Sequence, residues 1–426
     1  MNRNLRGLGI LAALSIAIVA CGPGASASPS PTEAASAAPT ATPEITEAPT
    51  LTGEITLWHS YGSGGGEIGG FNNIIAAVEA ANPDLDITVV EQPFDQLFNK
   101  WRTEVAAGGG PDMFIAPNDS LGQDAREGSL MNLDEWLTDN PALADFLPVS
   151  IDGSKVDVDE DGTGEFYMVP ESLKAVALWY NASEIATPPT TSEELLAAVT
   201  DGSVKLGINQ GPYHQFGWTG AFGGTLLNED GSCAAADGGF AEAYAYLKDL
   251  KDAGATFNTD GAAIDNGFKT GDLTAIIDGP WTTADFRTAA EAGGFELGVV
   301  PIPAGPGGDA NPFTGTDGWY INPNLDAAQA ELAVNLALAL TSAESQQVMV
   351  DEAGHIPANS TVAITDPITQ GFADAAAAGL PRPQGPTFNN WWGPFGNALN
   401  EIVDTGADAE TSIGNACTLM DEASGL

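Results

Sequence analysis

The chain of 426 residues carries 13 Lys and Arg against 58 Asp and Glu, which gives a formal net charge of −45. Such an acidic surface repels nucleic acid and anionic lipid, so both are unsuitable as partners. We interpret the charge as a solvated acidic coat, whose self-repulsion a salty surrounding would screen.

The first twenty residues have the pattern of an export signal. Two arginines precede an apolar run over 8–20, whose 13 residues are too few to span a bilayer as a helix. Small residues before a cysteine, with a glycine after it, occur at 19–22 and resemble the bacterial lipobox. This resemblance implies that 1–20 is a signal peptide and that two acyl chains on Cys21 anchor the protein to the membrane, outside the cytoplasm. An ordinary cleavable signal with a chance cysteine is the alternative.

The next segment, 21–52, consists largely of Ala, Ser, Pro, Thr and Gly. Because it has no periodic apolar face, burial cannot offset the entropy lost on ordering it, and we expect a flexible tether. The folded body then begins near Gly53 and has about 370 residues. Since this is more than one hydrophobic core usually supports, we expect two lobes.

Two cysteines remain for the body if Cys21 belongs to the anchor, namely Cys233 and Cys417. Outside the cell, two leftover cysteines often pair, but sequence spacing does not show whether they are close in space. A Cys233–Cys417 disulfide and two free buried thiols both remain open.

Strands and helices alternate in the first part of the body. The residues at 54–58, 85–90 and 113–116 have the pattern of strands. Between them, apolar residues at helical spacing predict helices over 71–81 and 94–105. This β-α-β-α-β order predicts a mostly parallel sheet with helices on its faces.

The later body continues this mixture of elements and shows no internal repeat. We expect strands over 174–180, 274–277 and 296–300, and helices over 191–200, 240–253, 327–340, 343–353 and 396–405. Thr191, with Glu194 three residues later, fits a capping box at the start of the first of these helices.

A glycine-rich loop at 64–69 satisfies G-x-G-x-x-G after a strand, and Glu91 ends the next strand, as in dinucleotide-binding proteins. Five residues separate this loop from Trp58, however, so the turn is loose where such a site needs it tight. The chain also has 51 glycines, which makes chance matches easy. An anchored extracellular protein, moreover, has no supply of a nicotinamide cofactor. We therefore favour a plain flexible loop over a dinucleotide-dependent enzyme.

Sequence motifs for hydrolysis or zinc binding are absent. HExxH, CxxC and GxSxG do not occur, and the three histidines, His59, His214 and His355, are widely separated. Carboxylates are too numerous for any two to stand out as a glycosidase pair. We expect no cofactor and no catalytic step, with an exported carbohydrate hydrolase as the alternative.

One acidic motif resembles the first half of an EF-hand calcium loop, with Asp157, Asp159 and Asp161 at alternate positions before a glycine. The twelfth position of the loop, where calcium binding needs a bidentate Glu, is Met168. An acidic hairpin turn is the favoured interpretation, and a weak calcium site is the alternative.

Several segments match one family in order over nearly the whole body. They lie at 55–61, 109–120, 165–181, 189–195, 268–281, 298–303, 315–321 and 382–383. The most specific is Phe268-Lys-Thr-Gly271 followed by Ile276-Ile-Asp-Gly-Pro-Trp281. Together they resemble the maltose-binding-protein family of extracellular solute-binding proteins.

The resemblance implies an α/β, two-lobed fold of the periplasmic-binding-protein type II (Venus flytrap), with mixed sheets flanked by helices. It places the N-terminal lobe at 53–171 plus 316–357 and the C-terminal lobe at 172–315 plus 358–426. The lobes would close on a ligand by hinge motion, and the permease of an ABC importer would recognise the closed, monomeric form. A sugar, and specifically an oligosaccharide, would be the ligand, with a non-sugar solute as the alternative.

Candidate binding residues follow from the same resemblance and from the chemistry of sugars. Sugars present flat C–H faces that pack on aromatic rings, and hydroxyl edges that need donors and acceptors. The polar candidates are Ser60, Tyr61, Asp119, Ser120 and Arg382. The aromatic candidates are Tyr213, Trp281, Trp319, Trp391 and Trp392. Asp119 would accept hydrogen bonds from sugar hydroxyls, and Arg382 would bind two sugar oxygens.

Lys174 departs from the family pattern, which often has Asp or Glu at this position facing the ligand. One hypothesis is that the ligand carries an acidic group, such as a uronic acid or a phosphate. The alternative is a hinge lysine that pairs with a nearby carboxylate.

Overall fold

The computed structural model describes residues 50–62 and 66–426. The expected signal peptide, Cys21 and nearly all of the tether lie outside these residues. Leu51 is already buried, and its backbone N–H donates to the side-chain oxygen of Asn82 at 2.8 Å, so the folded body includes residues before Gly53. None of the helices in the described part is both long and apolar enough to cross a bilayer.

The first five elements confirm the predicted β-α-β-α-β order. They are β1 (Gly53–His59), α1 (Gly66–Ala81), β2 (Leu85–Glu91), α2 (Phe94–Ala106) and β3 (Met113–Pro117). The strand β1 pairs in parallel with both β2 and β3. The apolar faces of α1 and β1 pack in one core, as their spacing predicts.

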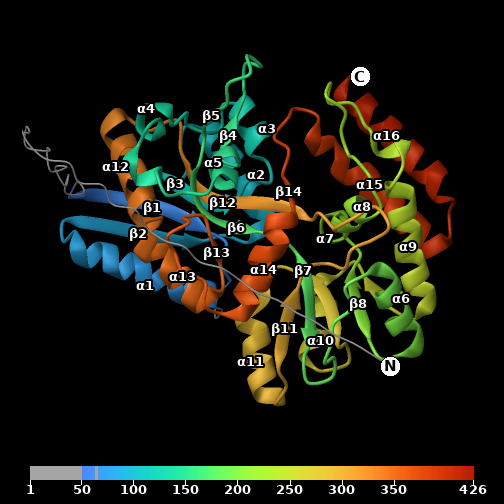
Figure 1. Ribbon diagram of the computed structural model, residues 1–426. Helices are drawn as coiled ribbons and strands as arrows, with labels where there is room; N and C mark the ends of the chain where they lie inside the picture. The colour runs from blue at the N-terminus through green and yellow to red at the C-terminus, as the bar shows by residue number, and fades with distance from the viewer. Residues whose placement is uncertain (1–49, 63–65) are drawn as a thin grey trace, which may run out of the picture. The chain divides into compact units, whose positions relative to one another are not determined.

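Four further strands complete this first sheet from distant parts of the chain. They are β6 (Val169–Lys174), β12 (Phe313–Ile321), β13 (Ile356–Pro357) and β14 (Leu380–Pro381). Within the described residues the sheet has seven strands in the order β13-β6-β12-β3-β1-β2, with β14 paired to β12. Because β12 is antiparallel to both β6 and β3, the sheet is mixed rather than parallel throughout. Helices α12 (Ala327–Leu340) and α13 (Ala343–Ala353), both at their predicted bounds, lie with α1 beside it (Figure 1).

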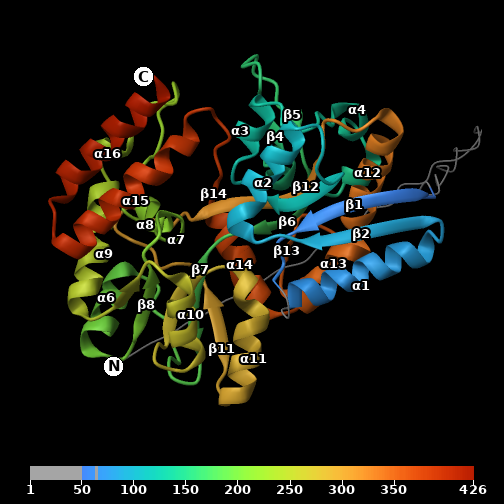
Figure 2. The same ribbon diagram turned by 180° about the vertical axis from the view of Figure 1, so that it is seen from behind.

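A second sheet gathers the middle of the chain. It contains β7 (Ala177–Asn181), β8 (Leu206–Asn209), β9 (Thr256–Asn258), β10 (Ala275–Asp278) and β11 (Leu297–Val300), in the order β11-β7-β10-β8-β9. Figure 2 shows this sheet beside α6 (Ser192–Asp201), α10 (Gly261–Lys269) and α11 (Thr283–Gly293). With the two sheets in view, the expected class, a two-lobed α/β fold with mixed sheets flanked by helices, is confirmed.

The single strand expected over 174–180 is two strands in two different sheets. The strand β6 ends at Lys174 in the first sheet, and β7 begins at Ala177 in the second. Ala175 and Val176, which join them, are as buried as the strands themselves. Because the apolar run continues through this connection, periodicity could not locate the break.

The remaining elements lie between and around these sheets. The helices are α3 (Leu121–Arg126), α4 (Asp134–Leu137), α5 (Pro148–Asp152), α7 (Pro212–Gln215), α8 (Gly217–Ala221), α9 (Phe240–Ala253), α14 (Pro367–Ala378), α15 (Trp392–Asn400) and α16 (Ala409–Ser424). Short helical turns are η1 (Pro141–Leu143), η2 (Ala235–Asp237), η3 (Pro280–Thr282), η4 (Phe388–Trp391) and η5 (Glu401–Thr405). The helix expected over 396–405 thus begins at Trp392 as α15 and ends in the π-helical turn η5.

The predicted cap of α6 is confirmed in part. The Thr191 side chain accepts the backbone N–H of Glu194 at 3.2 Å. The Glu194 carboxylate returns to the N–H of Thr190 at 2.9 Å, one residue earlier than a capping box requires. Both bonds satisfy backbone donors at the start of the helix.

The structure joins Cys233 and Cys417 in a disulfide, the first of the two alternatives left open by the sequence. The bond connects the loop before η2 to α16, near the end of the chain. It therefore links two segments that are 184 residues apart in the sequence.

The acidic motif is the turn of a two-stranded hairpin formed by β4 (Lys155–Val156) and β5 (Glu165–Phe166). The Asp157 carboxylate accepts the backbone N–H groups of Asp161 and Gly162. These bonds are those of an acidic turn, the favoured interpretation of the sequence. Among the described residues, Asp157, Asp159 and Asp161 have carboxylates within 4.8 Å of one another and are half-buried or exposed.

Candidate functional site

A cavity of about 640 Å³ lies where residues from both sheets meet. This volume is within the range of sites that bind small molecules. The lining residues are Ser60, Tyr61, Glu67, Phe94, Ile115, Ala116, Pro117, Asp119, Ser172, Leu173, Lys174, Tyr213, His214, Pro280, Trp281, Asp317, His355 and Trp392.

Most of the charged and hydroxyl groups of the cavity are on the side formed by the first sheet. Ser60 follows β1, Asp119 follows β3 and Lys174 ends β6. These three strands run in the same direction, so their carboxyl ends meet at one edge of the sheet. Asp317, on β12, lies at the same edge because β12 runs the opposite way.

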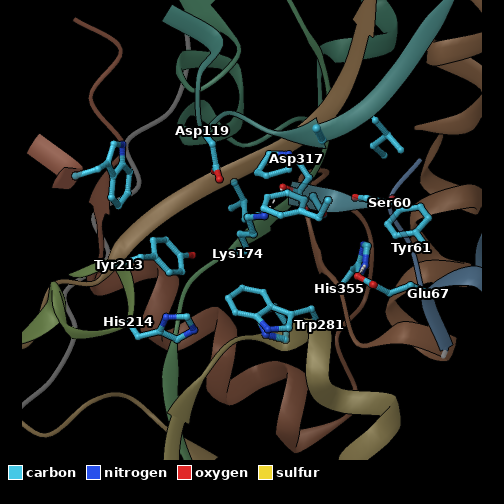
Figure 3. A pocket seen from close by; sticks show the side chains of 18 residues that line it. Ser60, Tyr61, Glu67, Asp119, Lys174, Tyr213, His214, Trp281, Asp317 and His355 are labelled. Atoms are coloured by element: carbon cyan, nitrogen blue, oxygen red, sulfur yellow. Dashed lines mark hydrogen bonds and ion pairs between the residues drawn. The ribbon is translucent and has the colours of Figure 1, made fainter. Parts of the chain in front are cut away.

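The side formed by the second sheet is mainly aromatic (Figure 3). Tyr213 and His214 are on α7, which follows β8, and Trp281 follows the neighbouring β10. The ring centroids of Tyr213 and Trp281 are 6.2 Å apart. Trp392, at the start of α15, adds a further ring. A ligand in the cavity therefore has aromatic rings on one side and charged or hydroxyl groups on the other.

The Tyr213 hydroxyl is the clearest open hydrogen-bonding group in the cavity. Its oxygen is buried and has no hydrogen-bond partner among the described residues. Burial raises the pKa of this phenol, and the nearby Asp317 and Asp278 raise it further, so it stays neutral at ordinary pH. A neutral phenol can both donate and accept, which makes it available to a ligand.

Seven of the eleven residues proposed from the sequence line the cavity. They are Ser60, Tyr61, Asp119, Lys174, Tyr213, Trp281 and Trp392. The other four, Ser120, Trp319, Arg382 and Trp391, do not line it.

Three of these four side chains are turned to other partners. Ser120 donates its hydroxyl to the Asp124 carboxylate at 2.9 Å. Trp319 is 1% exposed and packs against Phe71 on the core face of β12. Trp391 is fully buried in the core of the second sheet, while the adjacent Trp392 reaches the cavity.

Arg382 lies behind the cavity wall, with its side chain 1% exposed. Its guanidinium pairs with the Asp119 carboxylate through one terminal nitrogen, while its Nε has no hydrogen-bond partner among the described residues. The guanidinium carbon is 5.1 Å from the ring centroid of Tyr213 and 5.7 Å from that of Trp392. Burial lowers the pKa of Arg382 to about 9, so it remains charged at neutral pH. Arg382 therefore connects the Tyr213 and Trp392 rings on the aromatic side of the cavity to the Asp119 carboxylate on the opposite side.

Lys174 is paired with Asp317, whose nearer carboxylate oxygen is 3.0 Å from the ammonium nitrogen. Burial raises the pKa of Asp317, and Lys174 counteracts that rise. The same ammonium is 5.8 Å from the ring centroid of Trp281. This geometry is that of the alternative stated for Lys174, a lysine near a chain crossing that pairs with a carboxylate.

A buried histidine with two acidic partners also borders the cavity. In His355, Nδ1 is 3.3 Å from the Glu171 carboxylate and Nε2 is 3.1 Å from that of Glu67. Burial alone would lower the pKa of His355, but the two carboxylates raise it well above its ordinary value. The sequence offered no signal for this cluster, because its members are far apart in the chain and form no motif.

A second acidic cluster supports the loop that carries Trp281. The Asp278 carboxylate accepts the backbone N–H of Gly279 at 2.7 Å and lies 3.6 Å from Nε2 of His214. Burial and the neighbouring Asp278 raise the pKa of Asp265 to about 8. The Asp265 carboxyl therefore holds a proton at neutral pH, beside the loop that carries Trp281.

Comparison with known families matches residues 73–378 of the chain to the model described as bacterial extracellular solute-binding protein. The maltotriose-binding protein of Pyrococcus abyssi is 26% identical over 82% of this chain and 77% of its own length. The galactooligosaccharide-binding protein of Bacillus subtilis is 26% identical over 82% and 85%. The maltooligosaccharide ABC transporter solute-binding lipoprotein of Streptococcus pneumoniae is 25% identical over 83% and 86%.

Solved structures share the fold. The maltotriose binding protein of Thermus thermophilus superposes with a TM-score of 0.73 at 24% identity, over 87% of this chain and 99% of that one. The maltose-maltodextrin binding protein of Alicyclobacillus acidocaldarius gives a TM-score of 0.73 at 24% identity, over 87% and 100%.

Proposed function

We propose, on the premise that this chain belongs to the bacterial extracellular solute-binding proteins, that it captures a carbohydrate in the cavity and delivers it to the permease of an ABC importer. The observation that carries the proposal is the opposition of the two sides of the cavity. Trp281, Tyr213 and Trp392 offer ring faces, and Ser60, Asp119 and Asp317 offer hydrogen-bonding groups across from them.

This arrangement suits the two kinds of surface on a sugar ring. The C–H faces of a pyranose pack on aromatic rings, while its hydroxyl groups need paired donors and acceptors. In this proposal Trp281 and Tyr213 stack on the sugar and Asp119 accepts from its hydroxyls. Arg382 holds Asp119 in place instead of contacting the sugar, because it pairs with Asp119 from outside the cavity lining.

An oligosaccharide is the proposed ligand. The printed names of three relatives refer to maltotriose, galactooligosaccharide and maltooligosaccharide, which supports a ligand of more than one unit. A cavity of about 640 Å³ is consistent with such a size. The identity of the sugar units is left to the binding experiment below.

Delivery to a transporter is supported by the same comparisons. The Streptococcus pneumoniae relative is named an ABC transporter solute-binding lipoprotein, which also supports lipidation of Cys21 after removal of 1–20. We propose that the protein is a monomer anchored outside the cytoplasm through Cys21, with 21–52 as its tether. The proposed lobes, divided at 171/172, 315/316 and 357/358, would close on the ligand by a hinge.

We propose binding without turnover, so the ligand leaves the protein unchanged. No described feature favours the exported hydrolase or the dinucleotide-dependent enzyme. Part of the glycine-rich loop at 64–69 lies outside the described residues, and from Gly66 onward it is already helical.

A thermal-shift screen followed by calorimetry tests the proposal. A ligand that binds only the folded state raises the melting temperature, so one class of neutral or modified saccharide should do so and NAD should not. The recovered saccharide should be unchanged on chromatography. Trp281→Ala should abolish the shift, whereas Trp136→Ala, which removes a half-buried indole that does not line the cavity, should keep it. A shift with NAD alone, or cleavage of the saccharide, would refute the proposal.

A further inference from the structure

We infer that Asp317 sets the charge selectivity of the cavity: by neutralising Lys174 it makes the site accept uncharged saccharides and reject those that carry a carboxylate or a phosphate. The inference rests on the proposed function and names the class of saccharide that the site takes. It assigns a specificity role to a residue that sequence reasoning did not single out.

The local backbone directs the two side chains toward each other. In the pairing of β6 with β12, Lys174 is opposite Gly315, and Asp317 is opposite Ser172. Residues displaced by two positions on neighbouring strands lie on the same face within reach of long side chains. The pairing shifts register between Asp317 and Gly318, and such a bulge re-aims the side chain beside it.

Gly318 permits this bulge. A Cβ at Gly318 would be 2.4 Å from the carbonyl oxygen of Val169 on β6, so only glycine allows the two backbones to approach there. The result is a close ion pair at the cavity wall, with the Lys174 and Asp317 side chains 14% and 18% exposed.

Lys174 is also the cation that a ligand on Trp281 would meet. Its ammonium lies 5.8 Å from the Trp281 ring centroid, and Figure 3 shows it between that ring and Asp317. An acidic group on a sugar stacked at Trp281 would therefore reach Lys174 together with the Asp317 carboxylate. Lys174 would attract this acidic group and Asp317 would repel it.

The other cations near the cavity are already paired with carboxylates of the protein. His355 already has the carboxylates of Glu67 and Glu171, and Arg382 has that of Asp119. Among the described lining residues, the carboxylates Glu67, Asp119 and Asp317 outnumber the cations Lys174 and His355. Burying a further negative charge here would leave it unpaired, which is costly.

An uncharged sugar avoids this cost. Its hydroxyls can accept from the remaining N–H groups of Lys174 and donate to Asp317 while the ion pair stays intact. Rejection of a wrong ligand by a built-in repulsive group is a common source of specificity. In this cavity, Asp317 is that group.

The test compares the full-length protein with Asp317→Asn, an isosteric change that removes the charge. The probes are glucose- and galactose-based mono-, di- and trisaccharides. Each has an acidic counterpart in which a uronic acid replaces one terminal unit, and both ends of the longer sugars are tested. Calorimetry gives the ratio of the affinities for neutral and acidic members of each pair. We expect the wild type to prefer the neutral member by at least about tenfold, and Asp317→Asn to bind the acidic member at least about tenfold tighter than the wild type does.

Two controls isolate the ion pair. Asp317→Glu retains the charge and should retain the rejection of acidic probes. The double variant Asp317→Asn/Lys174→Gln should lose the gain shown by Asp317→Asn, because the freed ammonium is gone. A purely structural role for Asp317 would not produce tighter binding of one ligand class.

The outcomes separate this inference from the proposed function. Wild type that binds neutral and acidic probes equally overturns the inference, whether or not the variant folds, and leaves carbohydrate binding intact. The inference is also overturned if the wild type binds neutral saccharides but folded Asp317→Asn binds acidic saccharides no more tightly than the wild type does. Wild type that binds no saccharide refutes the proposed function and the inference with it.

Discussion

Gly279 lies against the indole of Trp281, so closely that a Cβ on Gly279 would be 2.1 Å from Cζ3 of the ring. The Gly279 backbone, at φ −101° and ψ 179°, is in a region that any residue adopts. The glycine is therefore required by the neighbouring ring and not by its own conformation. A methyl group at this position acts on the orientation of Trp281 with little effect on the backbone.

Gly279→Ala should displace the Trp281 ring and weaken saccharide binding by about 10- to 100-fold, which corresponds to ~1.4–2.8 kcal/mol. The melting temperature of the ligand-free protein should change little, because only one partly exposed ring has to move. Calorimetry and thermal unfolding measure the two effects. Gly109→Ala is the matched control, since the nearest atom to its added Cβ is at an ordinary 3.7 Å. Unchanged affinity in Gly279→Ala would show that Trp281 does not contact the ligand.

His355 should make stability depend on pH. Because Glu171 and Glu67 raise its folded pKa well above the ordinary value, the folded state holds a proton that the unfolded state releases. The stabilisation is fully present below the unfolded pKa of about 6.5 and is lost as pH rises through the folded pKa. His355→Gln should therefore lower the free energy of unfolding by about 3–5 kcal/mol at pH 6 and by less at alkaline pH. Melting temperatures of both proteins across pH 6–10 measure the difference, and a deficit independent of pH would contradict this account.

Asp265 also makes the stability of the fold decrease as pH rises, but through a different cause. Its folded pKa of about 8 lies above the ordinary value of 3.8, so the folded protein binds a proton more tightly than the unfolded chain does. Stability is therefore lost as pH rises from about 3.8 through about 8. Asp265→Asn should remove this slope and raise the melting temperature at pH 9 relative to the wild type. A variant that is less stable than the wild type at pH 9 would indicate that the ionised pair is favourable.

The Cys233–Cys417 disulfide should stabilise the fold without affecting the cavity. The bond closes a separation of 184 residues, and neither cysteine lines the cavity. Replacing both by serine should cost about 2–5 kcal/mol in the free energy of unfolding. The dissociation constant for the saccharide should stay the same, and denaturant unfolding with calorimetry measures both. Reductant should lower the wild-type stability toward that of the double variant and leave the variant unchanged.

Sequence reasoning succeeded where one local pattern determines the outcome. The periodicity of 240–253, 327–340 and 343–353 gave α9, α12 and α13 at their observed bounds, because each helix buries one apolar face. The resemblance carried by the segment Ile276-Ile-Asp-Gly-Pro-Trp281 led to Trp281, which follows β10 and lines the cavity. In both cases the signal and the structure lie within one stretch of chain.

It failed where the outcome depends on which distant segments meet. Trp391 ends η4 and the adjacent Trp392 begins α15, and only the packing of these turns decides that Trp392 reaches the cavity. Asp317 becomes the partner of Lys174 because β12 inserts beside β6, an order that local patterns do not contain. His355 and its two carboxylates come together for the same reason.

The position of β12 in the first sheet constrains how the chain matures. This strand lies between β6 and β3, so within residues 53–174 β1, β2 and β3 can pair with one another while β6 stays separated from them until Phe313–Ile321 has been made and inserted. Pairing of segments so far apart in sequence is slow. The first sheet is therefore completed only after most of the chain has been made, so its completion is a late step in folding.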